Sequence, residues 1–314
     1  MAVSVGPPLD AAQQAVLDGL TSTTNAGAVA FVRTRLRSSS GASGIVDRDT
    51  LAAPDDSFAI ASTEKTFVAV IVLQLVGAGQ LSLEDVVEAR LPGRVKDGQK
   101  ITIRMLLNHT SGIPQNPTAA LLPLDQQPGL LWAPGTRHQY SNVNYTIARN
   151  IAEAATGSSM DILIRDRILR PLSLDQTSVG DTWANTPAER HWLGATAGAG
   201  IGTTAADLAT FFEAIMDGRL LADAELQEML TTVPVTQPFA GSAAPSSAPE
   251  ASRAGLGIFG FDLPCGEAWG HGGDLLWYSN QVLVSRDGSK VSVVAQNVGG
   301  WALARAAAVT LYCS

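Results

Sequence analysis

Residues 62–76 read STEKTFVAVIVLQLV, a polar tetrapeptide that runs into a largely apolar stretch. Ser62 and Lys65 are three positions apart, and residues with this spacing lie on the same face of a helix. The apolar part, Phe67 to Val76, is too short to cross a bilayer, because a spanning helix needs about 20 apolar residues. We therefore expect a helix buried in the core, with the Ser62 hydroxyl and the Lys65 amine together at its entrance.

This pair has the composition of a nucleophile beside its base. A lysine whose stem lies against apolar side chains is disfavoured as a cation, so its amine can be neutral. A neutral amine can accept the Ser62 proton and make the hydroxyl an acylating nucleophile. The unpaired N–H groups at the start of a helix can stabilise the oxyanion that forms. An isolated Ser-x-x-Lys is more often a chance match, so the interpretation depends on further motifs.

The composition is typical of a globular enzyme and argues against several other classes. The chain has 314 residues, of which 46% are hydrophobic and 16% are charged, and its net charge is −8. This length is near the limit for one hydrophobic core, so we expect two lobes. Without a basic cluster, nucleic acid is not an expected partner. We predict no membrane span, no metal and no cofactor, because no long apolar run, His-x-x-x-His spacing, Walker motif or dinucleotide motif occurs.

The first residues, MAVSVGPP, have neither the charged nor the apolar region of a signal peptide. The protein is therefore expected to be either cytoplasmic or secreted, with its signal peptide removed in the second case. Cys265 and Cys313 are the only cysteines, which leaves two free thiols or one disulfide. The sequence does not indicate an oligomeric state.

Strands are predicted near both ends of the chain, and helices between them. We expect an α/β lobe from about 1–61 and 254–314, and a helical lobe from about 62–253, in one domain that spans 1–314. The Ser62 helix would lie where the lobes meet, which is where clefts form. The predicted strands are 26–35, 254–262, 275–285 and 291–297, with a turn and a short return strand in 38–57 and a loop at 234–252. The predicted helices are 9–20, Ser62 to about 77–79, 102–108, 145–156, 160–169, 205–217 and 300–311.

Two further motifs contain groups that could act on a substrate. Tyr140-Ser141-Asn142 follows a loop and combines a phenol that can relay a proton with an amide that can hold a carbonyl. His271-Gly272-Gly273 introduces a predicted strand, where glycines permit close approach of a ligand. Taken singly, each motif is more often structural. His109 lies at a predicted helix end, where we expect it to form loop hydrogen bonds.

Together and in this order, the three motifs resemble those of the serine β-lactamases and penicillin-binding proteins. The segments 106–113 (LLNHTSGI), 134–135 (Pro-Gly) and 255–257 (GLG) add to the likeness. The most similar branch contains class C β-lactamases, actinomycete D-alanyl-D-alanine carboxypeptidases, esterases and D-aminopeptidases. This resemblance covers about residues 9–313 and implies an α/β (α+β) fold, in which helices flank an antiparallel sheet and an all-helical lobe adjoins it.

The resemblance also implies a role for each motif. Ser62 would be the acylated nucleophile and Lys65 its proton acceptor. Tyr140 would carry the proton to the leaving group, and His271 would hydrogen-bond to Tyr140. Asn142 would hold the carbonyl on the acyl side of the substrate.

The remaining implied features concern the oxyanion, the substrate and the cysteines. The N–H groups of Ser62 and Asp274 would form the oxyanion hole, and Gly272, Gly273 and Asp274 would line the substrate site. Cys265 and Cys313 would form the disulfide seen in the secreted carboxypeptidases, which favours export.

The third motif departs from the carboxypeptidases of this family. They bind a free carboxylate with hydroxyl groups at and just after the third motif and with an arginine on a neighbouring strand. This chain has Gly272 and Asp274 at those two places, and the segment 258–262 contains no arginine. A carboxylate next to Asp274 would cost on the order of a few kcal/mol. Loop residues that could still supply a cation are Arg137, Arg190 and Arg253.

We therefore predict a serine hydrolase or acyltransferase that acts through an acyl-Ser62 intermediate. Its substrate would be a small peptide, ester, amide or β-lactam, turned over by a D-alanyl-D-alanine carboxypeptidase-like or an esterase/D-amino amidase-like enzyme. The alternatives are a class C-like β-lactamase, a peptide-cyclising thioesterase and a penicillin-binding sensor that acylates without turnover.

Overall fold

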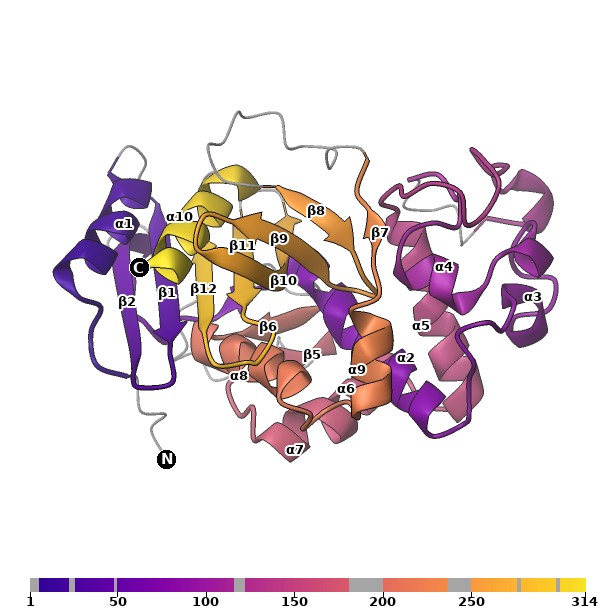
Figure 1. Cartoon of the computed structure of the whole chain (residues 1–314), viewed down its shortest axis with the longest axis horizontal. Helices are drawn as coiled ribbons and strands as arrows, with labels where there is room; N and C mark the ends of the chain where they lie inside the picture. The colour runs from indigo at the N-terminus through magenta and orange to yellow at the C-terminus, as the bar shows by residue number, and fades with distance from the viewer. Residues whose placement is uncertain are drawn as a thin grey trace.

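Strands from both ends of the chain lie side by side in one sheet of the computed structural model (Figure 1). This sheet has nine strands. The structure describes residues 6–22, 26–47, 50–115, 122–180, 200–236, 250–275, 278–297 and 300–314. The strand order is β3-β2-β1-β12-β11-β10-β9-β8-β7, and every neighbouring pair is antiparallel. The strands are β1 (Gly27–Arg33), β2 (Ser38–Asp47), β3 (Thr50–Leu51), β7 (Val233–Pro234), β8 (Ala251–Ala254), β9 (Phe259–Leu263), β10 (Gly266–Leu275), β11 (Tyr278–Val284) and β12 (Val291–Gln296).

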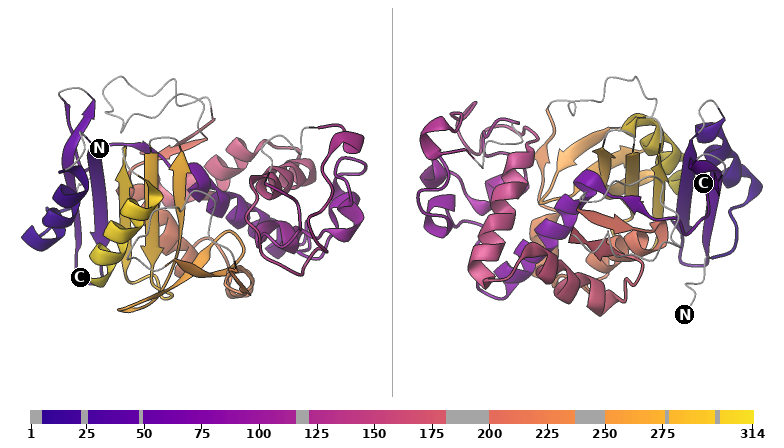
Figure 2. Two further views of the ribbon diagram at one scale, coloured as in Figure 1. Left: turned by 90° about the horizontal axis from the view of Figure 1, so that it is seen from above. Right: turned by 180° about the vertical axis from the view of Figure 1, so that it is seen from behind.

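Helices cover both faces of this sheet (Figure 2). Helices α1 (Ala11–Thr21) and α10 (Trp301–Cys313) pack on one face, and α8 (Ala205–Met216) packs on the other. In β1, Ala28 and Ala30 contribute to the core beneath α10, whereas Val29 and Phe31 belong to the core on the opposite face. Because successive side chains of a strand point to opposite faces, a strand buried on both sides has an unbroken apolar sequence.

Helix α2 (Glu64–Gly77) is the predicted buried helix. Its side chains from Lys65 to Leu73 are all buried, and the Phe67 ring stacks on that of Phe211 with 3.6 Å between centroids. A helix that is apolar on every side must be surrounded by protein. In Figures 1 and 2, α2 lies between the sheet and the helices formed within residues 87–156.

The other helices lie mainly between α2 and β7 in the sequence. They are α3 (Val87–Arg90), α4 (Ile103–Leu107), α5 (Asn142–Thr156), α6 (Met160–Ile164), α7 (Arg170–Leu172) and α9 (Asp223–Met229), and a π-helical turn, Arg165–Leu169, joins α6 to α7. Short 3-10 turns occupy Ala61–Thr63 (η1), Gly98–Lys100 (η2) and Leu124–Gln126 (η4). Thr204 caps α8, because its side chain accepts from the Asp207 N–H.

A second, three-stranded sheet leads the chain into the Ser62 turn. It has the order β4-β6-β5, with β4 at Phe58–Ala59, β6 at Ile201–Thr203 and β5 at Ser178–Val179. The Ile60 N–H continues the pairing by donating to the Ile201 carbonyl at 3.1 Å. The antiparallel sheet with flanking helices confirms the predicted fold class, while the proposed division into two lobes stays a prediction.

Several predicted strands have different bounds in the structure. Residues 38–47 form one long strand, not a turn with a short return strand, because residues 38–44 of β2 pair with β1 and its last residues pair with β3. The predicted strand 254–262 is divided between β8 and β9. Strands β7 and β8 enter the predicted loop 234–252 from either end, and residues 237–249 of that loop lie outside the described part. These bounds depend on how the strands pair, and the apolar pattern of a single strand does not show which strand it pairs with.

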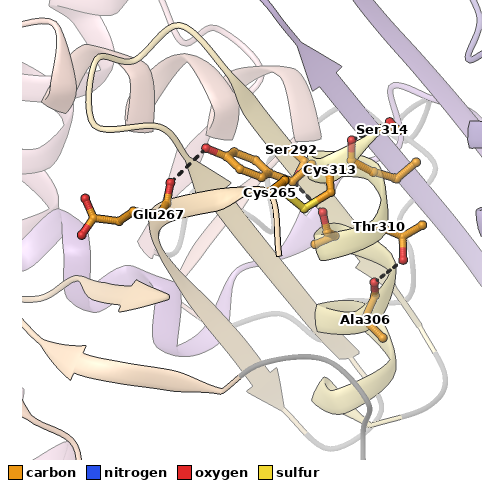
Figure 3. The surroundings of a disulfide bond; sticks show 10 residues. Cys265, Glu267, Ser292, Ala306, Thr310, Cys313 and Ser314 are labelled. Atoms are coloured by element: carbon orange, nitrogen blue, oxygen red, sulfur yellow. Dashed lines mark hydrogen bonds between the residues drawn. A yellow bond between two sulfur atoms is a disulfide. The ribbon is translucent and has the colours of Figure 1, made fainter. Parts of the chain in front are cut away.

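The chain ends beside the β9–β10 hairpin, where Cys313 forms a disulfide with Cys265 (Figure 3). This is the pairing that the family resemblance implies. In the same region the Tyr312 hydroxyl donates to the Glu267 carbonyl at 3.5 Å. The disulfide therefore fixes the last turn of α10 to the start of the strand that contains the third motif. None of the helices in the described ranges has the length and apolar character to cross a membrane.

Candidate active site

Ser62 lies in the 3-10 turn η1, and Lys65 lies in the first turn of α2. The Lys65 amine donates to the Ser62 hydroxyl with 3.1 Å between Nζ and Oγ. Only 9% of Lys65 is exposed, so little water competes for its amine. Ala61, directly before the serine, has a left-handed backbone with φ of 47°, an uncommon conformation for a residue with a side chain. The turn thus holds the serine and the amine in contact, as the sequence predicted.

Strand β10 lies directly against this turn. The Asn280 side chain on β11 donates from Nδ2 to the Ile60 carbonyl at 3.0 Å and accepts at Oδ1 from the Thr63 hydroxyl at 2.8 Å. Gly273, which pairs with Asn280, has no room for a side chain, because a Cβ there would overlap the Ile60 carbonyl oxygen. Asn280 and the bare Gly273 backbone therefore fix the distance between β10 and the Ser62 turn.

This contact was not predicted. The sequence contains a second Tyr-x-Asn, Tyr278-Ser279-Asn280, within the predicted strand 275–285. Residues two apart in a strand share a face, so sheet packing explains this pair adequately. The third motif was expected to lie before a strand. In the structure the motif lies within β10, whose ten residues pair with both β9 and β11. Glycine weakens a strand, so the glycine-rich motif gave little sign of one. The second Tyr-x-Asn was the only signal that could have directed attention to Asn280.

Tyr140 lies just before α5, close to the lysine. The Lys65 Nζ is 5.0 Å from the centre of the Tyr140 ring and 5.9 Å from that of Tyr145. The Tyr145 hydroxyl donates to the Leu107 carbonyl at 2.7 Å, and burial raises its pKa well above the usual value. Tyr145 therefore stays neutral and bound to the backbone. Both tyrosine rings lie close to the Lys65 amine.

Asn142, the first residue of α5, has its backbone N–H bound to the Gln115 side chain at 2.5 Å. Its side-chain Oδ1 is shielded from solvent and makes no hydrogen bond within the described residues. A buried carbonyl oxygen without a donor is costly, and a substrate N–H could satisfy it. This geometry is compatible with a substrate contact at Asn142, although the sequence assigned the contact to a substrate carbonyl.

His271 is 2% exposed and lies in β10 next to the lysine. Its Nδ1 is 2.7 Å from the Gly272 carbonyl, which can only accept, so the ring proton is on Nδ1. Burial lowers the pKa of His271 to about 3, and the ring is therefore neutral near pH 7. Its Nε2 forms no hydrogen bond in the described part of the chain. The bond to Tyr140 that the resemblance implies is thus not formed there, and the role of His271 stays a prediction.

Asp274 follows the third motif in β10 and pairs with Ser279. Its side chain is exposed at the end of the strand, and partial desolvation raises the pKa of its carboxyl group. The N–H of Asp274 lies on the strand that Asn280 and Gly273 hold against the Ser62 turn. That the Asp274 carboxylate lies beside a substrate bound at Ser62 stays a prediction.

The structure identifies the strands beside β10 as β9 and β11, and neither contains an arginine. The residue of β11 that pairs with Gly272 is Gln281, whose Oε1 accepts from the Trp301 indole N–H at 3.0 Å. A Cβ at position 272 would overlap this indole. The place where carboxypeptidases of the family carry a hydroxyl side chain is therefore filled by a tryptophan from α10.

Three arginines outside β9 and β11 were considered as a cation that could bind a substrate carboxylate. Arg253 on β8 forms ion pairs with Glu267 at 2.7 Å and with Asp262 at 3.1 Å. The exposed Arg137 has its guanidinium 5.8 Å from the centre of the Trp132 ring. Arg190 lies outside the described residues. The charge of Arg253 is thus already balanced by two carboxylates.

The described residues contain no group of three or more His, Cys, Asp or Glu side chains arranged to hold a metal ion. Three of the four histidines nevertheless lie near one another. The ring centres of His109 and His138 are 5.9 Å apart, and the Phe259 ring lies 6.4 Å from His138 and 5.1 Å from His271. Burial lowers the pKa of His138 to about 4, and it lowers the pKa of His109 well below the usual value. These rings are neutral packing and hydrogen-bonding groups at neutral pH.

Comparisons with known proteins identify relatives in sequence and in fold. The chain is 31% identical to a D-stereospecific amidohydrolase from Streptomyces, with a TM-score of 0.77 over 94% of this chain and 95% of that one. The D-amino acid amidase of Ochrobactrum anthropi SV3 superposes with a TM-score of 0.81 over 96% of each chain, at 24% identity, which supports the fold alone.

Among curated proteins, penicillin-binding protein 4 of Amycolatopsis lactamdurans is 36% identical over 152 residues, which cover 43% of this chain and 40% of that protein. PbpX, a putative penicillin-binding protein of Bacillus subtilis, is 28% identical over 201 residues, which cover 57% of this chain and 51% of that protein. The chain thus spans about half or less of the length of these curated relatives. The model of the beta-lactamase family matches residues 15–311. With this match over nearly its whole length, the chain belongs to the beta-lactamase family of serine hydrolases.

Proposed function

We propose that the protein is a serine amidase or esterase that acylates Ser62 and prefers substrates without a free carboxylate on the leaving group. The observation that carries the proposal is the 3.1 Å contact between the buried Lys65 amine and the Ser62 hydroxyl. This contact combines a nucleophile with a base in a water-poor site. The Streptomyces relative at 31% identity is a D-stereospecific amidohydrolase, which supports amides of D-amino acids as the first substrates to test.

In the proposed acylation step, Lys65 accepts the Ser62 proton while Oγ attacks the substrate carbonyl carbon. The N–H groups of Ser62 and Asp274 stabilise the oxyanion. The proton then passes from Lys65 through Tyr140 to the departing amine or alkoxide, and the bond to the leaving group breaks. A water molecule, or an amine, attacks the acyl-Ser62 ester in the second half of the reaction and gives back the free hydroxyl.

The preference for uncharged leaving groups follows from the charges at the end of β10. A substrate carboxylate about 4 Å from Asp274 would be repelled by about 4 kcal/mol at the effective dielectric constant of a protein surface. The neighbouring strands offer no arginine, and Arg253 is paired with Glu267 and Asp262. A neutral amide or ester avoids this repulsion, and a substrate with an ammonium group would be attracted.

The other activities within the family make different predictions. A D-alanyl-D-alanine carboxypeptidase would turn over an acyl-D-Ala-D-Ala peptide, and a β-lactamase would turn over a penicillin. A peptide-cyclising enzyme would release a cyclic product in place of an acid. A sensor would form a stable adduct with one acyl group per chain. We also propose that the protein is exported, since the disulfide between Cys265 and Cys313 suits an oxidising compartment.

Intact-mass measurement tests these options in one experiment. The protein is incubated with D-phenylalanine amide, a p-nitrophenyl ester, acyl-D-Ala-D-Ala or benzylpenicillin, and products are measured in the same samples. We expect turnover of the amide and the ester, and none of the free peptide. The Ser62→Ala variant is the control and should neither turn over substrate nor gain mass. A failure of every acyl donor to react at Ser62 would refute the proposed function.

A further inference from the structure

His109 connects the end of α4 to the loop that contains Tyr140. It follows Asn108 at the end of α4, has a left-handed backbone with φ of 59°, and is 3% exposed. Histidine is among the few residue types with a side chain that adopt this conformation with some frequency. The left-handed turn directs both the carbonyl and the imidazole of one residue toward the Tyr140 loop, as their hydrogen bonds show.

The residues on either side of Tyr140 are both bound to His109. The Gln139 N–H donates to the His109 carbonyl at 2.8 Å, and the Ser141 N–H donates to the His109 Nδ1 at 3.2 Å. Between these two bonds, the Tyr140 ring packs on the imidazole with 4.4 Å between centroids. The backbone of Tyr140 is therefore held before and after the tyrosine, and its ring has a fixed neighbour.

The protonation state of His109 suits this arrangement. Because Nδ1 accepts from a backbone N–H, the proton of the neutral ring is on Nε2. The Asn144 amide, whose Oδ1 accepts from the Ser111 hydroxyl at 2.7 Å, also lies 3.2 Å from Nδ1. A protonated imidazole could not accept from either donor. Burial, which lowers the pKa of His109 well below its usual value, keeps the ring in the neutral state.

We propose that His109 is a positioning residue, which fixes Tyr140 beside the Lys65 amine so that a proton can pass to the leaving group. The inference rests on the proposed role of Tyr140 and deepens it. The Lys65 Nζ is 5.0 Å from the centre of the Tyr140 ring, so a shift of this loop by about 1 Å would change the path of the proton. Displacements of that size can cost about 100-fold in rate.

A double-mutant cycle with Tyr140→Phe tests the proposal on the full chain. His109→Gly accommodates the positive φ and removes the ring, whereas His109→Asn also tolerates this φ and keeps an acceptor oxygen. Acylation is measured in single turnovers with the p-nitroanilide and the p-nitrophenyl ester of one D-amino acid. The anilide needs a proton on its leaving group, whereas p-nitrophenolate leaves without one. Thermal unfolding is recorded for every variant.

If His109 acts through Tyr140, His109→Gly should slow acylation by the anilide by about 100-fold and acylation by the ester by much less. In the Tyr140→Phe background the same change should cost less than about 3-fold, because the group it positions is absent. His109→Asn should recover part of the lost rate.

An equal loss in both backgrounds, or an equal loss for anilide and ester, would show a purely structural role and overturn the inference. An unchanged rate in His109→Gly would overturn it as well. If His109→Gly does not fold, the cycle with His109→Asn gives the same test on a smaller effect. If Tyr140→Phe alone keeps the wild-type rate, the proposed role of Tyr140 fails. The comparison of this single variant with the wild type separates that failure from a failure of the role proposed for His109.

Discussion

Adding one methyl group at Gly273 should disable the enzyme while leaving it folded. The ideal Cβ of an alanine there would lie 2.7 Å from the Asn280 Nδ2 and 3.0 Å from the Ile60 carbonyl carbon, and it would overlap the Ile60 oxygen. Carbon atoms in contact normally lie about 3.5–4.0 Å apart. Strand β10 and the Ser62 turn would therefore have to separate by on the order of 1 Å.

That separation acts directly on the proposed oxyanion hole. One of its N–H groups, that of Ser62, belongs to the turn, and the other, that of Asp274, belongs to β10. An effective donor lies about 2.7–3.1 Å from the oxyanion, and the loss of one donor costs about 10²–10³ in kcat. We therefore expect Gly273→Ala to lower kcat by about 10²–10³-fold, whereas KM changes much less.

The assay is steady-state hydrolysis of a p-nitrophenyl ester, with a thermal unfolding curve for each variant. Gly129→Ala is a matched control, because a Cβ at this exposed glycine meets no atom within 4 Å. We expect the control to keep the wild-type rate. A folded Gly273→Ala protein with kcat within about 3-fold of wild type would refute the reasoning, since the turn and the strand would then not need their present separation.

Three further predictions concern stability and specificity. Replacing Cys265 and Cys313 by serine should lower the free energy of unfolding by about 4 kcal/mol, because the disulfide closes a loop with a sequence separation of 48. The kcat should be unchanged. Denaturant unfolding measures the stability, and ester turnover measures kcat. The protein should lose stability as the pH falls from 6.5 toward 4, because unfolded chains bind protons at His138 near pH 6.5 whereas burial lowers its pKa to about 4 in the folded state. His138 alone should contribute about 2.5 kcal/mol of this loss at pH 4.5. In the His138→Gln variant, the melting temperature should therefore fall less steeply with decreasing pH than in the wild type. An equally steep fall in the variant would contradict the assignment to His138. Asp274→Asn should lower the inhibition constant of an acyl-D-Ala-D-Ala peptide, measured against turnover of the p-nitrophenyl ester, by about 10-fold or more. KM for a neutral amide should be nearly unchanged, and equal changes for both would rule out charge repulsion.

The reacting pair was predictable because its geometry is local. Ser62 and Lys65 are joined by one turn of backbone, so their spacing in the sequence sets their distance in space. The buried helix α2 was predictable for a similar reason, since nine of the ten residues from Phe67 to Val76 are apolar, which is typical of a helix surrounded by protein. The chemistry of the site and its position at the entrance to a core helix could therefore be read from residues 62–76.

The partners of this pair depend on contacts between distant segments. Asn280 could not be assigned from sequence, because its partners Ile60 and Thr63 are more than 200 residues away. The third motif was expected before a strand and lies within one, since its glycines are required by neighbours on both sides of β10 and not by a turn. His109 was expected to form loop hydrogen bonds, but only the fold shows that they flank Tyr140.

Some features that determine substrate preference are visible in the sequence, and others are visible only in the structure. Gly272, Asp274 and the lack of an arginine in residues 258–262 are visible in the sequence and indicate a missing carboxylate anchor. The sequence could not show that β11 is the second neighbour of β10, that Gln281 pairs with Gly272, or that the Trp301 indole fills the adjacent space. Local spacing and composition were enough to place the Ser62 hydroxyl beside the Lys65 amine. Strand pairing and helix packing, which join residues far apart in the chain, decide the shape and charge of the cleft that a substrate meets.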